Sequence, residues 1–271
     1  MPEFTARTGN AHMPHRTLVG RRCCYGLATR EGDQVPGQSL ELVAPSAAVV
    51  NVELAELPRV TSVAAHVRFA SGAYGRGFQI GPRGYHEFAC TYMVAANPVD
   101  RLLVHGREVV VSESLDKHTS VATLIGDYHE LMTVFGGPAP RRERLVELFA
   151  TLEIADQVRG MVVRPRRETL LGTMSEHIAL FAEGLGSLSI PGPAHAASLQ
   201  PRHQGARTMF GEVWRSPLPG VTSAAQLTDY TYTLGFPSAM AEVVFADADD
   251  AVTDADKLAW LEQINISWTV G

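Results

Sequence analysis

Two stretches of the chain place turn residues between apolar runs, as β-hairpins do. Residues 123–135 (TLIGDYHELMTVF) carry Gly126-Asp127 between two such runs, and residues 233–245 (TLGFPSAMAEVVF) carry a Gly-Phe-Pro-Ser segment there. Glycine, aspartate, proline and serine are the residues that tight turns favour. The pattern therefore predicts two hairpins.

A helical pattern follows each predicted hairpin. Apolar residues recur there at about the spacing that places them on one face of a helix. They are Leu145, Leu148, Phe149 and Leu152 in the first segment and Leu258, Leu261 and Ile264 in the second. Thr253 or Asp254 is expected to cap the second helix. Short strands are expected at residues 152–154 and 264–268.

Two glycine-rich runs, residues 75–86 (GRGFQIGPRGYH) and 184–195 (GLGSLSIPGPAH), carry the same residue at four aligned places. The matching pairs are Gly75 and Gly184, Gly77 and Gly186, Pro82 and Pro191, and His86 and His195. The predicted hairpins and helices, and also His66 and His177, recur at a similar separation of about 110 residues. Collinear matches at a nearly constant separation predict a duplicated unit.

Each unit is expected to open with a helix, at residues 57–72 and 165–186, and to continue through its glycine run into strands. Residues 88–96, 102–111 and 208–214 are the strand-like runs. The predicted fold class is α+β: two tandem, duplicated units, each an antiparallel sheet with flanking helices, related by pseudo-two-fold symmetry.

The expected organisation has three parts. Residues 1–20 form a flexible N-terminal segment, residues 21–158 the first α+β unit and residues 159–271 the second. The first unit carries additional strands at residues 39–44 and 48–54. Met13 is a candidate natural start, so residues 1–12 could derive from an expression vector.

Composition narrows the classes of function. Apolar residues make up 45% of the chain and charged residues 19%, which is enough to build a packed core. The net charge of −6 argues against a general nucleic-acid binder, and no apolar run is long enough to predict a transmembrane helix. The three cysteines Cys23, Cys24 and Cys90 form neither a disulfide framework nor a zinc motif, which indicates a reducing, cytoplasmic setting.

The repeated histidines are the candidates for chemistry. His66, His177, His86 and His195 could ligate a metal if they met in a cleft between the units, and Glu87 beside His86 could add acid–base catalysis. The alternative is that each histidine packs in the same structural niche twice. The glycine runs do not fit a phosphate-binding turn, because that turn needs a strand before it and a helix after it. No cofactor is expected.

Opposite charges stand at matching places in the two units, and they are the candidate binding residues. The basic set is Arg141, Arg142, Arg144, Arg166 and Arg167, and the acidic set is Asp254 and Asp256. Such patches could join copies of the chain head to tail or hold a partner. The alternative is that both are ordinary solvated faces.

Two functions from different classes follow from these patterns. The favoured one is a non-enzymatic binding or assembly protein that presents a pseudo-symmetric platform to a protein partner or to itself, with no nucleic acid or membrane involved. The alternative is an enzyme or metal-binding protein that uses the repeat-related histidines in the cleft between the units. Whether the protein is an enzyme stays open at this point.

Overall fold

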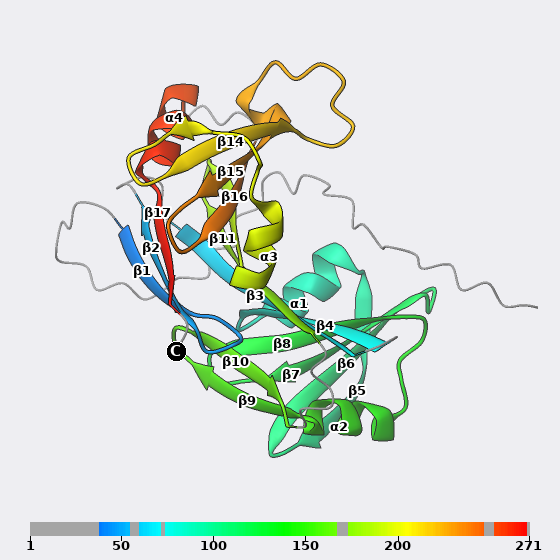
Figure 1. Cartoon of the computed structure of the whole chain (residues 1–271). Coiled ribbons are helices and arrows are strands. Elements are labelled where there is room, and N and C mark those ends of the chain that lie inside the picture. Colours follow the sequence, from blue (N-terminus) through cyan, green and yellow to red (C-terminus); the bar gives the residue numbers. More distant parts are fainter. Residues whose placement is uncertain (1–37, 55–59, 72–73, 167–172, 247–251, 270–271) are drawn as a thin grey trace, which may run out of the picture.

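The computed structural model describes residues 38–54, 60–71, 74–166, 173–246 and 252–269. Strands account for 55% of these residues and helices for 18%. Most strands belong to one sheet of 12 strands. The protein is therefore mostly β (Figure 1).

The predicted α+β class, with a separate sheet and flanking helices in each unit, is wrong. β3 (Val60–Ser71) and β11 (Thr173–Ala182), one from each predicted unit, pair antiparallel from Val60 opposite Ala182 to Ala70 opposite Thr173. This pairing joins the strands of both predicted units into one sheet. The helices are too few and too short to form a layer of their own on each unit.

The large sheet is antiparallel throughout, because every pair of neighbouring strands runs in opposite directions. From one edge to the other the strands are β13 (Ala206–Arg207), β14 (Glu212–Pro217), β15 (Tyr230–Gly235), β16 (Met240–Phe245), β12 (Gly186–Pro191), β11, β3, β4 (Tyr74–Pro82), β8 (His129–Gly136), β7 (Thr119–Ile125), β6 (Arg107–Ser114) and β5 (Ala96–Val104). The strands on the two sides of the β3–β11 pair follow each other in the same order. Outward from the pair, the order is β4, β8, β7, β6 and β5 on one side and β12, β16, β15, β14 and β13 on the other.

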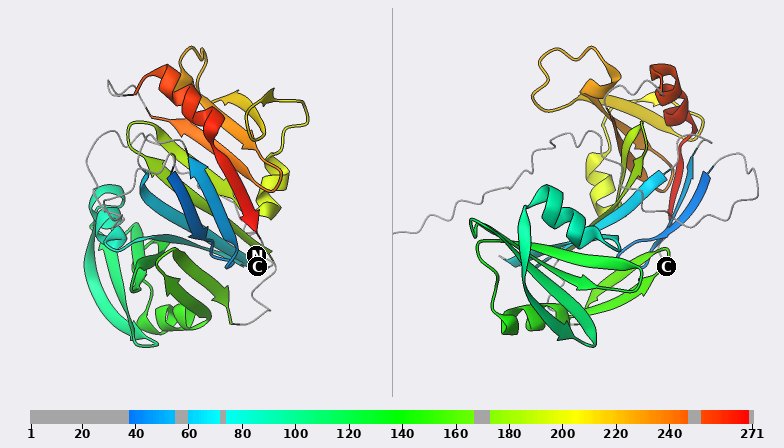
Figure 2. Two further views of the ribbon diagram at one scale, coloured as in Figure 1. Left: turned by 90° about the vertical axis from the view of Figure 1, so that its left-hand side faces the viewer. Right: turned by 180° about the vertical axis from the view of Figure 1, so that it is seen from behind.

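Two small sheets cover one face of the large sheet. The first consists of β1 (Gln38–Val43), β2 (Val49–Leu54) and β17 (Asn265–Thr269), so strands from near both ends of the described chain meet in it. The second is the hairpin of β9 (Leu152–Gln157) and β10 (Gly160–Pro165), and the boundary predicted after residue 158 lies in its turn. Figure 2 shows both small sheets from two further directions.

The helices lie on both faces of the large sheet (Figure 1). α2 (Arg142–Ala150) and α4 (Asp254–Gln263) pack on the same face as the small sheets. α1 (Tyr85–Phe88), which continues into the π-helix η1 (Ala89–Met93), and α3 (Pro193–Leu199) lie on the opposite face. A 3-10 turn spans Leu227–Asp229. Among the helices of the described residues, none is long and apolar enough to cross a membrane.

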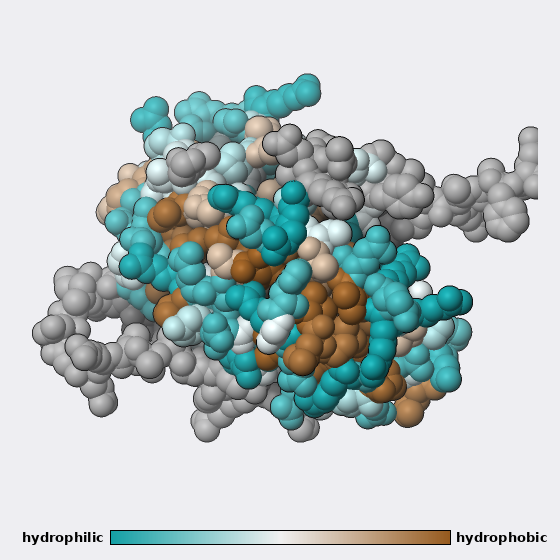
Figure 3. All heavy atoms as spheres, turned by 90° about the horizontal axis from the view of Figure 1, so that it is seen from below, coloured by the Kyte–Doolittle hydropathy of each residue, from teal (hydrophilic) through white to brown (hydrophobic). Residues whose placement is uncertain are grey.

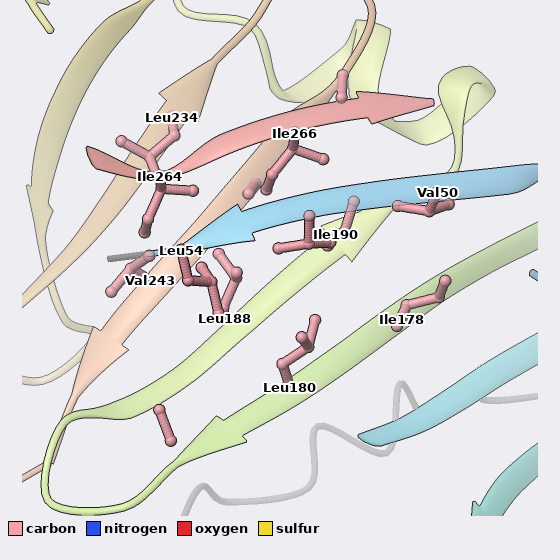
Figure 4. Packing of buried hydrophobic residues seen from close by; sticks show 14 of the residues in the cluster. Val50, Leu54, Ile178, Leu180, Leu188, Ile190, Leu234, Val243, Ile264 and Ile266 are labelled. Carbon is pink, nitrogen blue, oxygen red and sulfur yellow. The ribbon is translucent and has the colours of Figure 1, made fainter. Parts of the chain in front are cut away.

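Two hydrophobic cores lie between the large sheet and the elements that cover this face. In the core of the second half, Ile178 and Leu180 of β11 face Leu54 of β2 and Ile266 of β17 (Figure 4). In the core of the first half, side chains of β4, β7 and β8 pack against Phe149 of α2. The first-half core is the one that positions the candidate site described below.

The predicted hairpins and the two helices that follow them are confirmed. They correspond to β7–β8, β15–β16, α2 and α4. Thr253 caps α4, because its side chain accepts a hydrogen bond from the backbone N–H of Asp256 and the Asp256 carboxylate accepts one in return. The local pattern was therefore sufficient to predict these hairpins and helices.

The helices predicted before the glycine runs are wrong, because those segments contain the central strands β3 and β11. In β11 the buried positions are Glu176, Ile178, Leu180 and Ala182, every second residue, which is the period of a strand. The opposite error occurs at residues 88–96, predicted as a strand, where the chain completes α1 and forms η1.

Candidate functional site

The glycine-rich run at residues 75–86 forms β4 and the start of α1 and is not a phosphate-binding turn. Its glycines leave room for side chains of neighbouring elements to lie across the strand. A Cβ atom at Gly77 would lie 3.0 Å from His66 Nε2, and one at Gly81 would lie 2.3 Å from the ring of Tyr85. The glycines therefore serve packing against β4 rather than ligand binding.

His66 and His177 meet at the centre of the large sheet, directly opposite each other in the β3–β11 pair. Their rings are stacked, with centroids 5.0 Å apart and planes inclined by 24°. Burial, with a smaller effect of Arg68, lowers the pKa of His66. Burial, followed by the neighbouring His66 and His195, lowers the pKa of His177 to about 4. The two rings therefore pack as a neutral pair at neutral pH.

His86 is buried in α1, and hydroxyl groups contact both of its ring nitrogens. Nδ1 lies 2.7 Å from Thr123 Oγ1, and Nε2 lies 2.9 Å from Ser112 Oγ. The sulfur of Cys90 lies 3.6 Å from Nε2. Burial lowers the pKa of His86 and raises that of Cys90, so the neutral imidazole and the protonated thiol are favoured. This network ties α1 and η1 to β6 and β7.

Glu130 of β8 fixes the start of α1. Its buried carboxylate accepts hydrogen bonds from the backbone N–H of Gly84, at 2.9 Å, and of His86, at 2.7 Å. These contacts satisfy donors that a helix start leaves free. Glu87, the carboxylate predicted to act with His86, is exposed and belongs to none of these contacts.

The four predicted histidines do not converge on one cleft. His66 and His177 form the central pair, and the exposed His195 of α3 is close enough to lower the pKa of His177. His86 is buried in α1 and contacts Thr123 and Ser112 instead. Within the described part of the chain, no group of three or more His, Cys, Asp or Glu side chains is placed to hold a metal ion.

The predicted basic residues gather around the start of α2 and the end of β10. Arg141 is the residue before α2, and Arg142 and Arg144 lie in its first turn. Arg142 forms an ion pair with Asp100 of β5, with an Nε–Oδ2 distance of 2.6 Å. Arg166 follows β10, and Arg167 lies outside the described residues.

The predicted acidic residues lie in the first turn of α4, in the other half of the sheet. Asp256 takes part in the cap with Thr253, and Asp254 lies 3.9 Å from the ammonium group of Lys257. Both carboxylates therefore have structural partners. In this position they also complement the partial positive charge of the helix start.

A hollow opens on the surface beside α2, where the core of the first half reaches the outside. Its floor is apolar and consists of Val104, Leu124, Phe149 and Leu152, each at most 4% exposed. The hollow has a volume of about 190 Å³. Figure 3 views the molecule from below Figure 1, where α2 and β9 lie, and shows apolar side chains surrounded by hydrophilic ones.

Two arginines stand at the rim of this hollow, together with His105 and Ile154. Arg107, at the start of β6, donates from Nη1 to the carbonyl oxygen of Ile154 at 3.3 Å. Arg166 donates from Nε to the carbonyl oxygen of Leu152 at 3.1 Å. We call this feature, with its apolar floor and two guanidinium groups, the arginine hollow.

Within the described residues, neither rim arginine has a carboxylate partner and no acidic side chain lines the hollow. Each guanidinium carries several N–H donors, of which the backbone carbonyl occupies only one. The remaining donors and the positive charge are free to meet an anion. The arginine hollow therefore combines a largely buried apolar floor with two cationic groups at its rim.

The edge of β9 that carries these carbonyls is held in place at its far end. Asp156 accepts hydrogen bonds from the backbone N–H of Tyr128 at 2.7 Å and from Nδ1 of His129 at 2.8 Å, at the tip of the β7–β8 hairpin. Burial opposes ionisation of Asp156, but these hydrogen bonds lower its pKa overall. The wall of the hollow is thus tied to the large sheet by a buried, charged contact.

A second hollow, beside α3, is smaller. Its volume is about 90 Å³, and Glu176 and His195 are among the residues that line it. Burial raises the pKa of Glu176, and Ser46 N–H donates to its carboxylate at 2.8 Å. This space offers one carboxylate that already has a partner, so we take the arginine hollow as the candidate functional site.

Arg166 belongs to the predicted basic set, whereas Arg107 does not. The signal for Arg107 was the His105-Gly106 pair before it, which forms a turn with positive φ angles of 49° and 80°. Such a turn predicts a hairpin, and a hairpin would have placed Arg107 at the open end of the sheet.

Comparisons of the chain with models of known protein families, with curated proteins and with solved structures give no match. The function is therefore argued from the site alone.

Proposed function

We propose that the protein is a non-enzymatic binding protein that holds its ligand or protein partner by an anionic group in the arginine hollow. The observation that carries this proposal is the pair of guanidinium groups, Arg107 and Arg166, whose hydrogen bonds within the described residues go to backbone carbonyls beside the hollow. A protein partner and self-association, expected from the sequence, remain within this proposal, as does a cytoplasmic setting.

The physical reason is the geometry of arginine. The planar guanidinium can donate two parallel hydrogen bonds to a carboxylate or phosphate, and it keeps its charge at every physiological pH. A lone surface ion pair contributes little to affinity. Two arginines that share an anion above an apolar floor contribute more, because the floor excludes water from one side of the contact.

The histidine-based alternative has no comparable support. His86 and Cys90 favour their uncharged forms in a buried network, and His66 and His177 stack on each other. Each of these side chains has a structural partner that accounts for its position. A binding role for the arginine hollow is therefore the proposal that we carry forward.

Thermal unfolding in a panel of anions tests the proposed function. We expect at least one of four anions, phosphate, sulfate, acetate or phenylacetate, to raise Tm above its value in sodium chloride of equal ionic strength. The rise in Tm should saturate as the anion concentration increases. Stabilisation follows because an anion that binds only the folded state shifts the unfolding equilibrium. The double variant R107M/R166M should lose this response.

The matched control is R101M, because Arg101 lies in the same β5–β6 hairpin but pairs with Glu108. It should keep the response of the wild-type protein. Equal Tm values in all the anions and in chloride would contradict the proposed function, and so would an equal response in the double variant.

A further inference from the structure

The spacing of the two arginines indicates how an anion would sit. Leu152 and Ile154 are two residues apart, and their carbonyl oxygens both accept from side chains on the same edge of β9. Equivalent atoms two residues apart in a strand are about 6.6 Å apart. The two arginines therefore approach neighbouring points on one edge of β9, where a single anion could be placed between them.

The floor of the arginine hollow indicates what the anion carries. Val104, Leu124, Phe149 and Leu152 offer no polar side-chain atom, so a hydroxylated body such as a sugar would bury polar groups without partners. A hydrocarbon body gains free energy from the same floor. The four floor side chains therefore favour an apolar body over a hydroxylated one.

The volume limits the size of that body. A protein cavity of about 150 Å³ holds one benzene molecule, so the hollow of about 190 Å³ has room for a group of about that size. A branched aliphatic group or a single aromatic ring is of this size. A long acyl chain would extend beyond the floor into solvent.

We infer that the ligand of the arginine hollow is a carboxylate carried on a small branched or aromatic hydrocarbon group. The carboxylate contacts Arg107 and Arg166, and the hydrocarbon group lies on the floor. Two sources supply this chemistry: a free carboxylic acid, or the C-terminal residue of a protein chain when that residue is apolar. The inference rests on the proposed function and adds the ligand class to it.

Calorimetric titration of the full chain tests the ligand class with five probes: acetate, phenylacetate, phenylacetamide, inorganic phosphate and benzyl alcohol. Phenylacetate should bind about threefold more tightly than acetate, because the floor exposes only a small apolar area for the ring to cover. Phenylacetamide and benzyl alcohol should not bind detectably, because they lack the charge. R107M/R166M should weaken phenylacetate binding at least about tenfold, and R101M should leave it unchanged.

The source of the carboxylate is decided by a second arm with the peptide Ac-Gly-Gly-Phe and its C-terminal amide. Tighter binding of the free-acid peptide than of phenylacetate, with loss in the amide, assigns the site to a chain terminus. Weaker binding of the peptide assigns it to a free acid. If phosphate or acetate binds as tightly as phenylacetate, the inferred ligand class is wrong while anion binding itself stands.

Discussion

Replacing Gly186 with alanine will lower the free energy of unfolding by about 3 kcal/mol or more. Gly186 begins β12 with a φ of +135°, a conformation that L-residues rarely adopt. A Cβ atom there would lie 2.1 Å from the carbonyl oxygen of Val244 and 2.7 Å from the backbone nitrogen of Ala246. Both atoms belong to backbone, so the clash cannot be relieved by turning a side chain.

Urea denaturation of G186A measures this effect, and G106A is its matched control. Gly106 also has a positive φ, of +80°, but a Cβ atom there would meet no atom within 4 Å. G106A should therefore show only the backbone strain, about 1 kcal/mol. Equal losses in the two variants would contradict the close approach of β12 to β16, which closes the core of the second half.

Acidification from pH 7 to pH 5 will destabilise the wild-type protein by about 2 kcal/mol more than it destabilises a variant with glutamine in place of His177. The pKa of His177 is about 4 in the folded protein and about 6.5 in a free histidine. The folded state therefore binds a proton less readily than the unfolded state. The contribution of the uncharged His177 to the free energy of unfolding is intact above pH 6.5 and is lost progressively as the pH falls toward 4.

Urea denaturation of the wild-type protein and H177Q at both pH values measures this difference. H118Q is the control, because His118 is exposed in the turn between β6 and β7, and it should respond to pH as the wild-type protein does. If the wild-type protein and H177Q lose the same stability between pH 7 and pH 5, the lowered pKa of His177 in the half-buried stack with His66 is contradicted.

The parts of the fold that the sequence predicted are those defined by short-range pattern. The two hairpins follow from turn residues between apolar runs, and α2 and α4 follow from one apolar helix face. Thr253 was predicted as a cap because its hydroxyl can accept from a helix N–H, and it does so. Each of these elements depends on residues that are close together along the chain.

The fold class could not be read in the same way, because it depends on which strands pair. Ile178 and Phe181 fit one face of a helix, whereas Ile178 and Leu180 fit one face of a strand, and only pairing with β3 decides between the two. Sequence separation between β3 and β11 exceeds 100 residues, so no local rule connects them. The continuous sheet was therefore missed.

The candidate site was partly predictable for a similar reason. The basic set included Arg166 because it stands in a run of charges, and charge is visible in the sequence. Arg107 stands alone in an apolar hairpin and gains its significance from contact with β9, which lies 47 residues further along the chain. His86 was singled out correctly as a residue that needs an explanation, and its contacts with Thr123 and Ser112 supply a structural one.

The central claim is that the arginine hollow is the binding site, and methyl NMR of the full chain tests it most directly. With phenylacetate added, the account predicts saturable shifts of the methyl signals of Leu124, Leu152 and Ile154, which line the hollow, and no shift of Leu188 or Ile190 in the other core. Unchanged signals of the three lining residues, or shifts confined to the other core, would contradict it.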